Sequence, residues 1–354
     1  NLFFGPARAG WCIMALAIAI GLTTWFAVGL LLLLPILLTL THETKRPFLL
    51  LALPLLSCLS VMHGLMPPHP GPVIAIDKLK ANAGMVLVWG FVIGLPTAAV
   101  AGPLFARWAV KRVTANPPEL PVRVFDENRR APLFGITLFT MLLPVVLMLC
   151  ATVAELILPK EHPVRAVTSF VGHPTIALGV SVLLAMWSLG TRCGYGKGTL
   201  LKFTEQSVGT VGMTLLVVGG GGGFAAVLRD AGVATSLGNM AQTLHLPPLV
   251  FGWMVAAFIR VATGSATVSI TAAAGVLAPL LSTMPGVNVE LLVIAVGCGS
   301  LFLSHLNDGG FWIVKDCLGL TVGQTLRTWT VTETIVGIGG LLLTLLVDFV
   351  LHLF

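Results

Sequence analysis

Charged residues are scarce in this sequence, and their scarcity excludes a water-soluble protein. Asp, Glu, Lys and Arg make up 10% of the 354 residues, hydrophobic residues make up 56%, and the mean hydropathy is +0.98. A soluble domain of this length could not keep so much apolar surface away from water. The composition therefore predicts a chain whose partner is the lipid bilayer.

Tyrosine and paired cysteines are also lacking. The formal net charge is +6, but one Tyr offers little surface on which nucleic-acid bases could stack. Six cations crowd into residues 107–131, where the preference of Lys and Arg for the cytoplasmic side explains them. The six cysteines form no Cys-x-x-Cys pair, so we expect them to be small packing residues. We expect no nucleic-acid partner, no cofactor and no metal.

Long apolar stretches are abundant, and about 20 such residues are needed to cross the hydrocarbon core. The candidate spans are 10–40, 48–66, 85–108, 132–158, 174–189, 208–246, 248–281, 291–303 and 330–353. Eleven Lys and Arg residues in the connections fall on one face and four on the other, so the face with 107–131 is expected to be cytoplasmic. The pattern predicts an all-α polytopic membrane protein.

The stretch 208–246 is about twice the length of one span. It contains five glycines at 219–223, and Arg229 and Asp230 lie near its middle. Loop charges favour a re-entrant hairpin that enters and leaves by the cytoplasmic face, with Asp230 at its tip. Backbone of this kind is tolerated at depth where it is buried in protein or faces water.

Two regions of the chain show the same pattern, in which an apolar stretch with an internal interruption is followed by a second break. One has the stretch 10–40 interrupted at 25–29 and a second break at 63–72; the other has 248–281 interrupted at 260–269 and a second break at 304–312. Gly29 and Gly264 are 235 residues apart, and Gly71 and Gly309 are 238 apart. Loop charges place the two second breaks on opposite sides of the membrane. Inverted repeats with broken helices are typical of transporters that alternate access around a midplane site.

This plan divides the chain into four segments. They are a first-repeat remainder at 1–106, a basic cytoplasmic loop at 107–131, scaffold helices at 132–207, and a second repeat at 208–354 that holds the hairpin, the broken helix, the 304–312 break and a C-terminal helix. The sequence begins at Asn1 without a Met, and we expect it to be cut from a longer chain.

A cation in the middle of an apolar stretch marks the candidate site. Arg260 at bilayer depth is costly unless it lines a cavity or has a partner, and it can hold a carboxylate through a charge-assisted contact. The half-helix that begins near Ser265 directs free N–H groups toward the same place, and its dipole favours an anion. Nearby hydroxyls suit a polyhydroxylated solute. The expected substrate-binding residues are Arg260, Thr263, Gly264, Ser265, Thr267, His69, Gly71 and Asn307.

The same residues could instead have purely structural roles. Ser and Thr hydroxyls can bond to carbonyls of their own helix, and Arg260 can extend to an interface. His63 and His69 can equally be packing residues.

Two ionisable residues are candidates for proton coupling. Asp308 is the first, because a carboxylate beside an apolar stretch can take up and release a proton during transport. His305 is the second, since imidazole titrates in the physiological range. The alternative is that 307–310 forms an interfacial turn. Three further acids lie near span ends and are expected at the interface: Glu155, Glu333 and Asp348.

Several motifs together give the chain a family resemblance. They are 65–72 with its PPHPGP core, 101–103, 172–174, the GGGGGFAAVLRDAG stretch at 219–232, RVATGSATV at 260–268, GSLFLSHLNDGGFW at 299–312, and 333–335. With them the sequence resembles the gluconate permease family of bacterial gluconate:proton symporters, in the ion-transporter superfamily. The resemblance runs along nearly the whole chain.

The resemblance implies a multi-pass protein of the bacterial inner membrane, with scaffold and transport domains in a homodimer. It implies uptake of gluconate or a related sugar acid with protons. Two departures stand out. Family chains carry an N-terminal portion that this sequence begins after, and Ala27 stands where relatives tend to carry an acid.

Other functions are weighed against this one. A carrier for another small anion, such as D-serine or a dicarboxylate, stays open, although one cation suits one carboxylate better than two. An intramembrane enzyme is disfavoured because no Ser–His pair in suitable surroundings and no metal-ligand spacing occurs. A channel is disfavoured because discontinuous inverted repeats usually serve alternating access.

Overall fold

The computed structural model describes residues 9–115, 131–159, 161–232, 236, 246–284 and 286–353. These residues form helices and short connections without a strand, so the prediction of an all-α chain is confirmed. Six helical segments in the described part of the chain are long and apolar enough to cross a membrane: Phe26–Thr44, Phe48–Leu79, Ala83–Ala109, Phe134–Ile157, Pro174–Cys193 and Val322–Leu351. The chain divides into two compact units, 1–120 with 220–354, and 121–219.

The first half of the larger unit consists of broken helices followed by a continuous one. Its elements are α1 (Ala9–Gly21), α2 (Phe26–Thr44), α3 (Phe48–Leu65), α4 (Pro70–Leu79), and α5 (Ala83–Ala99), which continues through the π-helical η2 (Val100–Leu104) into α6 (Phe105–Ala109). Pro70 occupies the first turn of α4, where its missing N–H costs no helical hydrogen bond. The chain therefore restarts a helix directly after the second break.

The second half of this unit repeats the order. Its elements are α12 (Pro248–Thr263), α13 (Ala266–Leu277) with η5 (Ala278–Thr283), α14 (Val289–Leu301), α15 (Gly309–Cys317), and α16 (Val322–Thr325), which continues through η6 (Leu326–Thr330) into α17 (Val331–Leu351). At about 1.5 Å per residue, the 16 residues of α12 reach roughly 24 Å, less than the ~30 Å hydrocarbon core. By itself α12 is therefore shorter than one membrane span.

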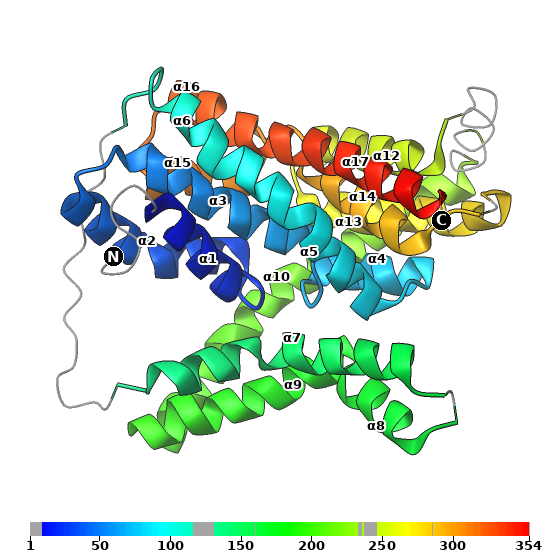
Figure 1. Ribbon diagram of the computed structural model, residues 1–354, viewed down its shortest axis with the longest axis horizontal. Coiled ribbons are helices and arrows are strands. Elements are labelled where there is room, and N and C mark those ends of the chain that lie inside the picture. The colour runs from blue at the N-terminus through cyan, green and yellow to red at the C-terminus, as the bar shows by residue number, and fades with distance from the viewer. Residues whose placement is uncertain are drawn as a thin grey trace. The chain divides into compact units, whose positions relative to one another are not determined.

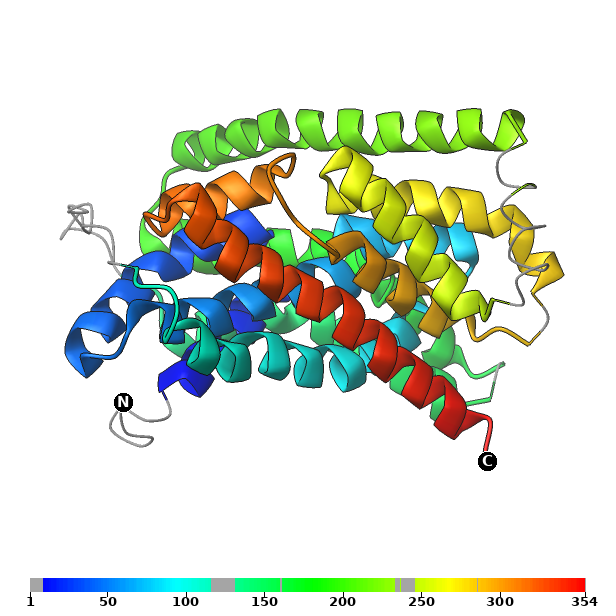
Figure 2. The same cartoon turned by 90° about the horizontal axis from the view of Figure 1, so that it is seen from above.

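Packing in the two halves follows the same pattern. Helix α1 packs on α3 and α3 packs on α5, just as α12 packs on α14 and α14 packs on α17. In α3 all residues except Leu50 and His63 are buried, and every residue of 291–301 in α14 is buried. These two helices form the core of the unit, and α17 runs beside α5 and over α14 (Figures 1 and 2).

The first interruption lies earlier than the sequence predicted. Helix α1 ends at Gly21 and α2 begins at Phe26, so 26–29 are helical and the break is 22–25. The Thr24 hydroxyl bonds back to the Ile20 carbonyl at 2.8 Å, and extended Trp25 then precedes the new helix. The second interruption is shorter than predicted and consists of Gly264 and Ser265 alone.

Helix α10 (Lys197–Asp230) contains the first arm of the predicted hairpin. It begins eleven residues before 208 and passes through the glycines at 219–223 without a break, so these glycines do not form a turn. The helix ends at Asp230, the expected tip, and Gly232 has a φ of +72°. Most of the return arm, and most of the basic loop at 107–131, lie outside the described residues.

The smaller unit is built on two long apolar helices. Helix α7 (Phe134–Ile157) packs against α9 (Pro174–Ala185), which continues as η3 (Met186–Gly190) and η4 (Thr191–Cys193), and α8 (Pro163–Val171) lies between them in sequence. The hydroxyls of Thr140 and Ser188 form a buried hydrogen bond of 3.1 Å that joins α7 to η3. Large apolar side chains such as Phe134 and Leu156 stay exposed, as expected for surfaces that face lipid.

Candidate functional site

The break between α12 and α13 places Arg260 inside the larger unit. Arg260 is in the last turn of α12, and its side chain is 3% exposed. Gly264 ends the helix in the left-handed region, with φ +72°, and donates its N–H to the Arg260 carbonyl at 2.9 Å. A Cβ at Gly264 would collide with the backbone of Asn307, so glycine permits the close approach of the 302–308 segment.

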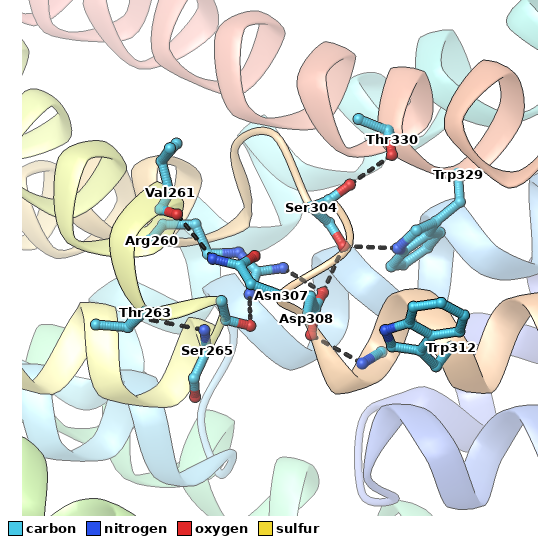
Figure 3. Close-up of polar contacts among 12 residues, drawn as sticks. Arg260, Val261, Thr263, Ser265, Ser304, Asn307, Asp308, Trp312, Trp329 and Thr330 are labelled. Atoms are coloured by element: carbon cyan, nitrogen blue, oxygen red, sulfur yellow. Dashed lines mark hydrogen bonds and ion pairs between the residues drawn. The ribbon is translucent and has the colours of Figure 1, made fainter. Parts of the chain in front are cut away.

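Arg260 forms a buried ion pair with Asp308. Its Nη2 lies 2.5 Å from Asp308 Oδ2, and its Nη1 donates to the Gly264 carbonyl (Figure 3). Nε of Arg260 has no partner among the described residues. Burying two charges costs several kcal/mol per ion, which only good geometry and further hydrogen bonds offset.

Asp308 receives those further bonds from its surroundings. It is the N-cap of α15, where its Oδ1 accepts the Gly310 N–H at 2.8 Å, and its Oδ2 accepts the Ser304 hydroxyl. The Trp329 indole N–H donates to Ser304 Oγ at 2.7 Å, so η6 supports the carboxylate through Ser304 (Figure 3). Arg260, Ser304, Asp308 and Trp329 are called the polar cluster below.

The first half contributes a matching contact at its own break. His69 Nε2 lies 2.7 Å from the Gly21 carbonyl at the end of α1, and Asn307 donates its amide to the Val261 carbonyl near the end of α12 at 2.8 Å. In each half a side chain from the second break thus bonds to a carbonyl beside the first. His63 lies edge-on to His69, with ring centroids 5.3 Å apart, and is within electrostatic reach of Arg260.

The polar cluster also joins the two halves. The Phe26 ring, at the start of α2, packs against the Trp329 ring with centroids 5.0 Å apart. Gly71 of α4 lies so close to α13 that a Cβ there would be 2.7 Å from Ile270 Cγ2. Both breaks of each half therefore meet in one compact unit.

The other predicted site residues make mostly local contacts. The exposed Thr263 hydroxyl bonds to the Ile259 carbonyl of its own helix at 2.8 Å. Ser265 is half-buried and caps α13 by accepting the Val268 N–H at 3.3 Å. Thr267 lies half-buried in the first turn of α13, and His305 is half-buried in the 302–308 segment.

Glu333 is more deeply buried in the protein than the sequence interpretation suggested. It was expected at the interface, but it is 1% exposed and is near enough to Arg260 and Asp308 for their charges to act on it. The predicted span began at 330, whereas the continuous helix begins at Val322 and so carries Glu333 eleven residues inside it. The sequence did contain a signal of this burial, namely an acid in an apolar stretch. It was missed because the predicted start of the span, at 330, was too late.

The site has one buried cation, and an internal acid already occupies it. Any external anion that binds Arg260 has to compete with Asp308, or Asp308 has to be neutralised. Binding of an anion to Arg260 would therefore depend on the charge of Asp308.

Comparison with known proteins gives the chain its relatives. The family model described as GntP family permease matches residues 2–350. A gluconate permease of Pseudomonas aeruginosa is 40% identical over 351 residues, which cover 98% of this chain and 78% of the relative. The Gnt-II system L-idonate transporter of Escherichia coli is 40% identical over 99% of this chain and 79% of its own length. A D-serine transporter of Escherichia coli is 34% identical over 94% and 75%.

Proposed function

Because the chain belongs to the GntP family of permeases, we propose that it takes up gluconate or a closely related sugar acid together with protons. The chain is a multi-pass protein of the bacterial inner membrane and a transporter, not an enzyme. The observation that carries the proposal beyond the family is the buried Arg260–Asp308 pair at the ends of broken helices. Such helix ends, near the middle of the bilayer, are where transporters bind ions and anionic solutes.

The proposed coupling is an exchange of carboxylates on one guanidinium. In the empty site Arg260 holds ionised Asp308, and their charges cancel. When a proton binds Asp308, the acid loses its charge and the substrate carboxylate takes its place on Arg260. The loaded site is then neutral again, with one proton and one monoanion added. Coupling by this route predicts electroneutral symport.

Substrate hydroxyls have partners close to the exchanged carboxylate. The exposed Asn307 side chain and the half-buried Ser265 hydroxyl border Gly264, and α13 presents its N-terminus there. The first-half residues His69 and Gly71 belong to the opposite wall in this proposal. In this proposal, the larger unit moves against a scaffold, and that movement exposes the site to alternate sides of the membrane. The scaffold forms the interface of a homodimer.

The matched packing of the two halves supports an inverted repeat. The breaks of α1–α2 and α12–α13 correspond, as do those of α3–α4 and α14–α15. Under the charge-based topology, the two copies have opposite directions across the membrane. A site between opposite copies can open to either side by the same motion.

The first prediction tests substrate and coupling together. The full chain in proteoliposomes is expected to accumulate labelled gluconate under an inward proton gradient, and an imposed membrane potential alone is expected to add little. Competition by unlabelled gluconate, L-idonate and D-serine ranks the substrates.

The Asp308→Asn variant is the matched test of the coupling residue. The amide keeps the size of the side chain but cannot carry a proton, so the variant is expected to retain exchange between preloaded vesicles and to lose gradient-driven accumulation. Unchanged accumulation in Asp308→Asn would place coupling elsewhere, with His305 the next residue to replace. Absence of sugar-acid uptake by the unmodified chain would reject the proposed function itself.

A further inference from the structure

Glu333 is a buried carboxyl that the exchange of carboxylates does not use. It lies in the first turn of α17 and is 1% exposed. Its Oε1 accepts no hydrogen bond from the described residues, and no described cation forms an ion pair with it. With Oε1 unpartnered, an ionised carboxylate here would lack part of the hydrogen bonding that offsets lost hydration.

The neighbours of Glu333 offer it little charge compensation. Helix α17 packs against α3, α5, α12, α14 and η2. Ser60 of α3 is within hydrogen-bonding reach of the carboxyl, and α5 and η2 contribute no ionisable residue. The ionisable residues on or beside the other packed elements are Cys58 and His63 of α3, Arg260 of α12, Glu290 and Cys298 of α14, Arg327 of η6, and Asp308.

The charges of Arg260 and Asp308 act on Glu333 in opposite directions. Arg260 attracts a negative charge at Glu333, and Asp308 repels it. Arg260 is already bonded to Asp308 at 2.5 Å and to the Gly264 carbonyl. One guanidinium therefore faces two acids, and the ion pair with Asp308 uses its charge.

We propose that Glu333 is a second proton-binding site beside the polar cluster, and that it keeps its proton in both the empty and the loaded states. The neutral acid leaves Arg260 free to alternate between Asp308 and a substrate carboxylate. An ionised Glu333 would instead compete for Arg260 and repel both. The part of the inference that concerns transport rests on the proposed function, whereas the protonation of Glu333 does not.

Infrared difference spectroscopy tests the protonation without any substrate. The full chain at neutral pH is expected to show the carbonyl stretch of a neutral carboxylic acid, and Glu333→Gln is expected to remove it. Glu290→Gln is the matched control, because the Glu290 carboxylate lies at the start of α14, where it accepts the Asn82 N–H at 3.0 Å. This control is expected to leave the band unchanged.

A second acid variant covers the case in which Glu333→Gln does not fold. Glu333→Asp keeps a carboxyl on a shorter side chain, so the band is expected to shift in frequency instead of disappearing. A band that is unaltered by either substitution at Glu333 would overturn the proposal.

A transport experiment measures substrate exchange between preloaded vesicles at increasing pH. Asp308→Asn removes the proposed coupling acid, so a loss of exchange at alkaline pH in this variant reports Glu333. Exchange is expected to fall about tenfold per pH unit once Glu333 ionises, as for a single titrating group. Adding Glu333→Gln is expected to remove that fall, and an identical fall in the double variant would contradict the proposal. If the unmodified chain exchanges no sugar acid, the proposed function fails and the infrared result still decides the role of Glu333.

Discussion

Arg260 and Asp308 depend on each other for their burial. Removing one partner strands the other charge in a site with little water, which costs about 3–5 kcal/mol. Arg260→Ala is therefore expected to abolish uptake and to lower the unfolding temperature of the detergent-solubilised protein. Arg260→Lys is expected to restore part of the uptake, because an ammonium keeps the charge but loses the planar fork of donors.

The double variant Arg260→Ala/Asp308→Asn separates stability from binding. It removes both charges, so it is expected to regain much of the lost thermal stability while uptake stays absent. Normal gluconate affinity in either alanine variant, measured by competition binding, would mean that the substrate does not use Arg260.

Single residues show which parts of the site the sequence could predict. Arg260 and Asp308 stand out in sequence because charge is rare in apolar stretches. Their pairing does not, since they are 48 residues apart and lie in different elements. The contact between His69 and the Gly21 carbonyl is equally hidden, because it depends on how two breaks fold together. Sequence patterns identify charged residues whose burial is energetically costly. Which residues pair with them depends on tertiary packing.

At the scale of elements, the break between α12 and α13 depends on Gly264. Its φ of +72° disfavours any side chain, and a Cβ there would collide with the Asn307 backbone. Gly264→Ala is therefore expected to displace the 302–308 segment, to separate Asp308 from Arg260, and to abolish uptake. Trypsin sensitivity and uptake in vesicles measure the two effects.

Gly286 provides the matched control for Gly264. It has a similar φ of +77°, but a Cβ there meets nothing within 4 Å. Gly286→Ala thus carries the backbone strain, about 1 kcal/mol, without the collision, and uptake is expected to persist. Equal loss of uptake in the two variants would show that backbone strain alone is responsible and that contact with Asn307 is not required.

Helix boundaries were the least predictable feature of the elements. Gly, Pro and polar residues interrupt the apolar stretches at 63–72 and 304–312, and helices do break in these regions, but the breaks are at 66–69 and 302–308. At 25–29 the interruption was misplaced, because extended Trp25 starts a helix that includes Gly29. At 219–223 five glycines remain helical, so glycine alone did not mark a turn.

At the scale of the whole molecule, the broken helices of the larger unit converge on one buried core. Helices α3 and α14 cross so closely that a Cβ at Gly64 would lie 2.6 Å from Leu301 Cδ1, and one at Gly297 would lie 2.6 Å from the Gly64 carbonyl. The larger unit is thus tightly packed around the point where its breaks meet. We expect it to move as a body, because packed cores deform little.

Cysteine accessibility tests whether that body exposes its site to both sides of the membrane. On a background without the six native cysteines, Ser265→Cys is expected to react with membrane-impermeant thiol reagents from either side, depending on conformation. Saturating gluconate is expected to protect it, because a carboxylate at the N-terminus of α13 would cover the thiol. Loss of the Ser265 cap costs about 1 kcal/mol, which the folded protein should tolerate.

Glu43→Cys, at the exposed end of α2, is the control and is expected to react from the cytoplasm only, without protection. Reaction of the Ser265→Cys thiol from one side alone, unaffected by a transported solute, would contradict a midplane site and alternating access around it.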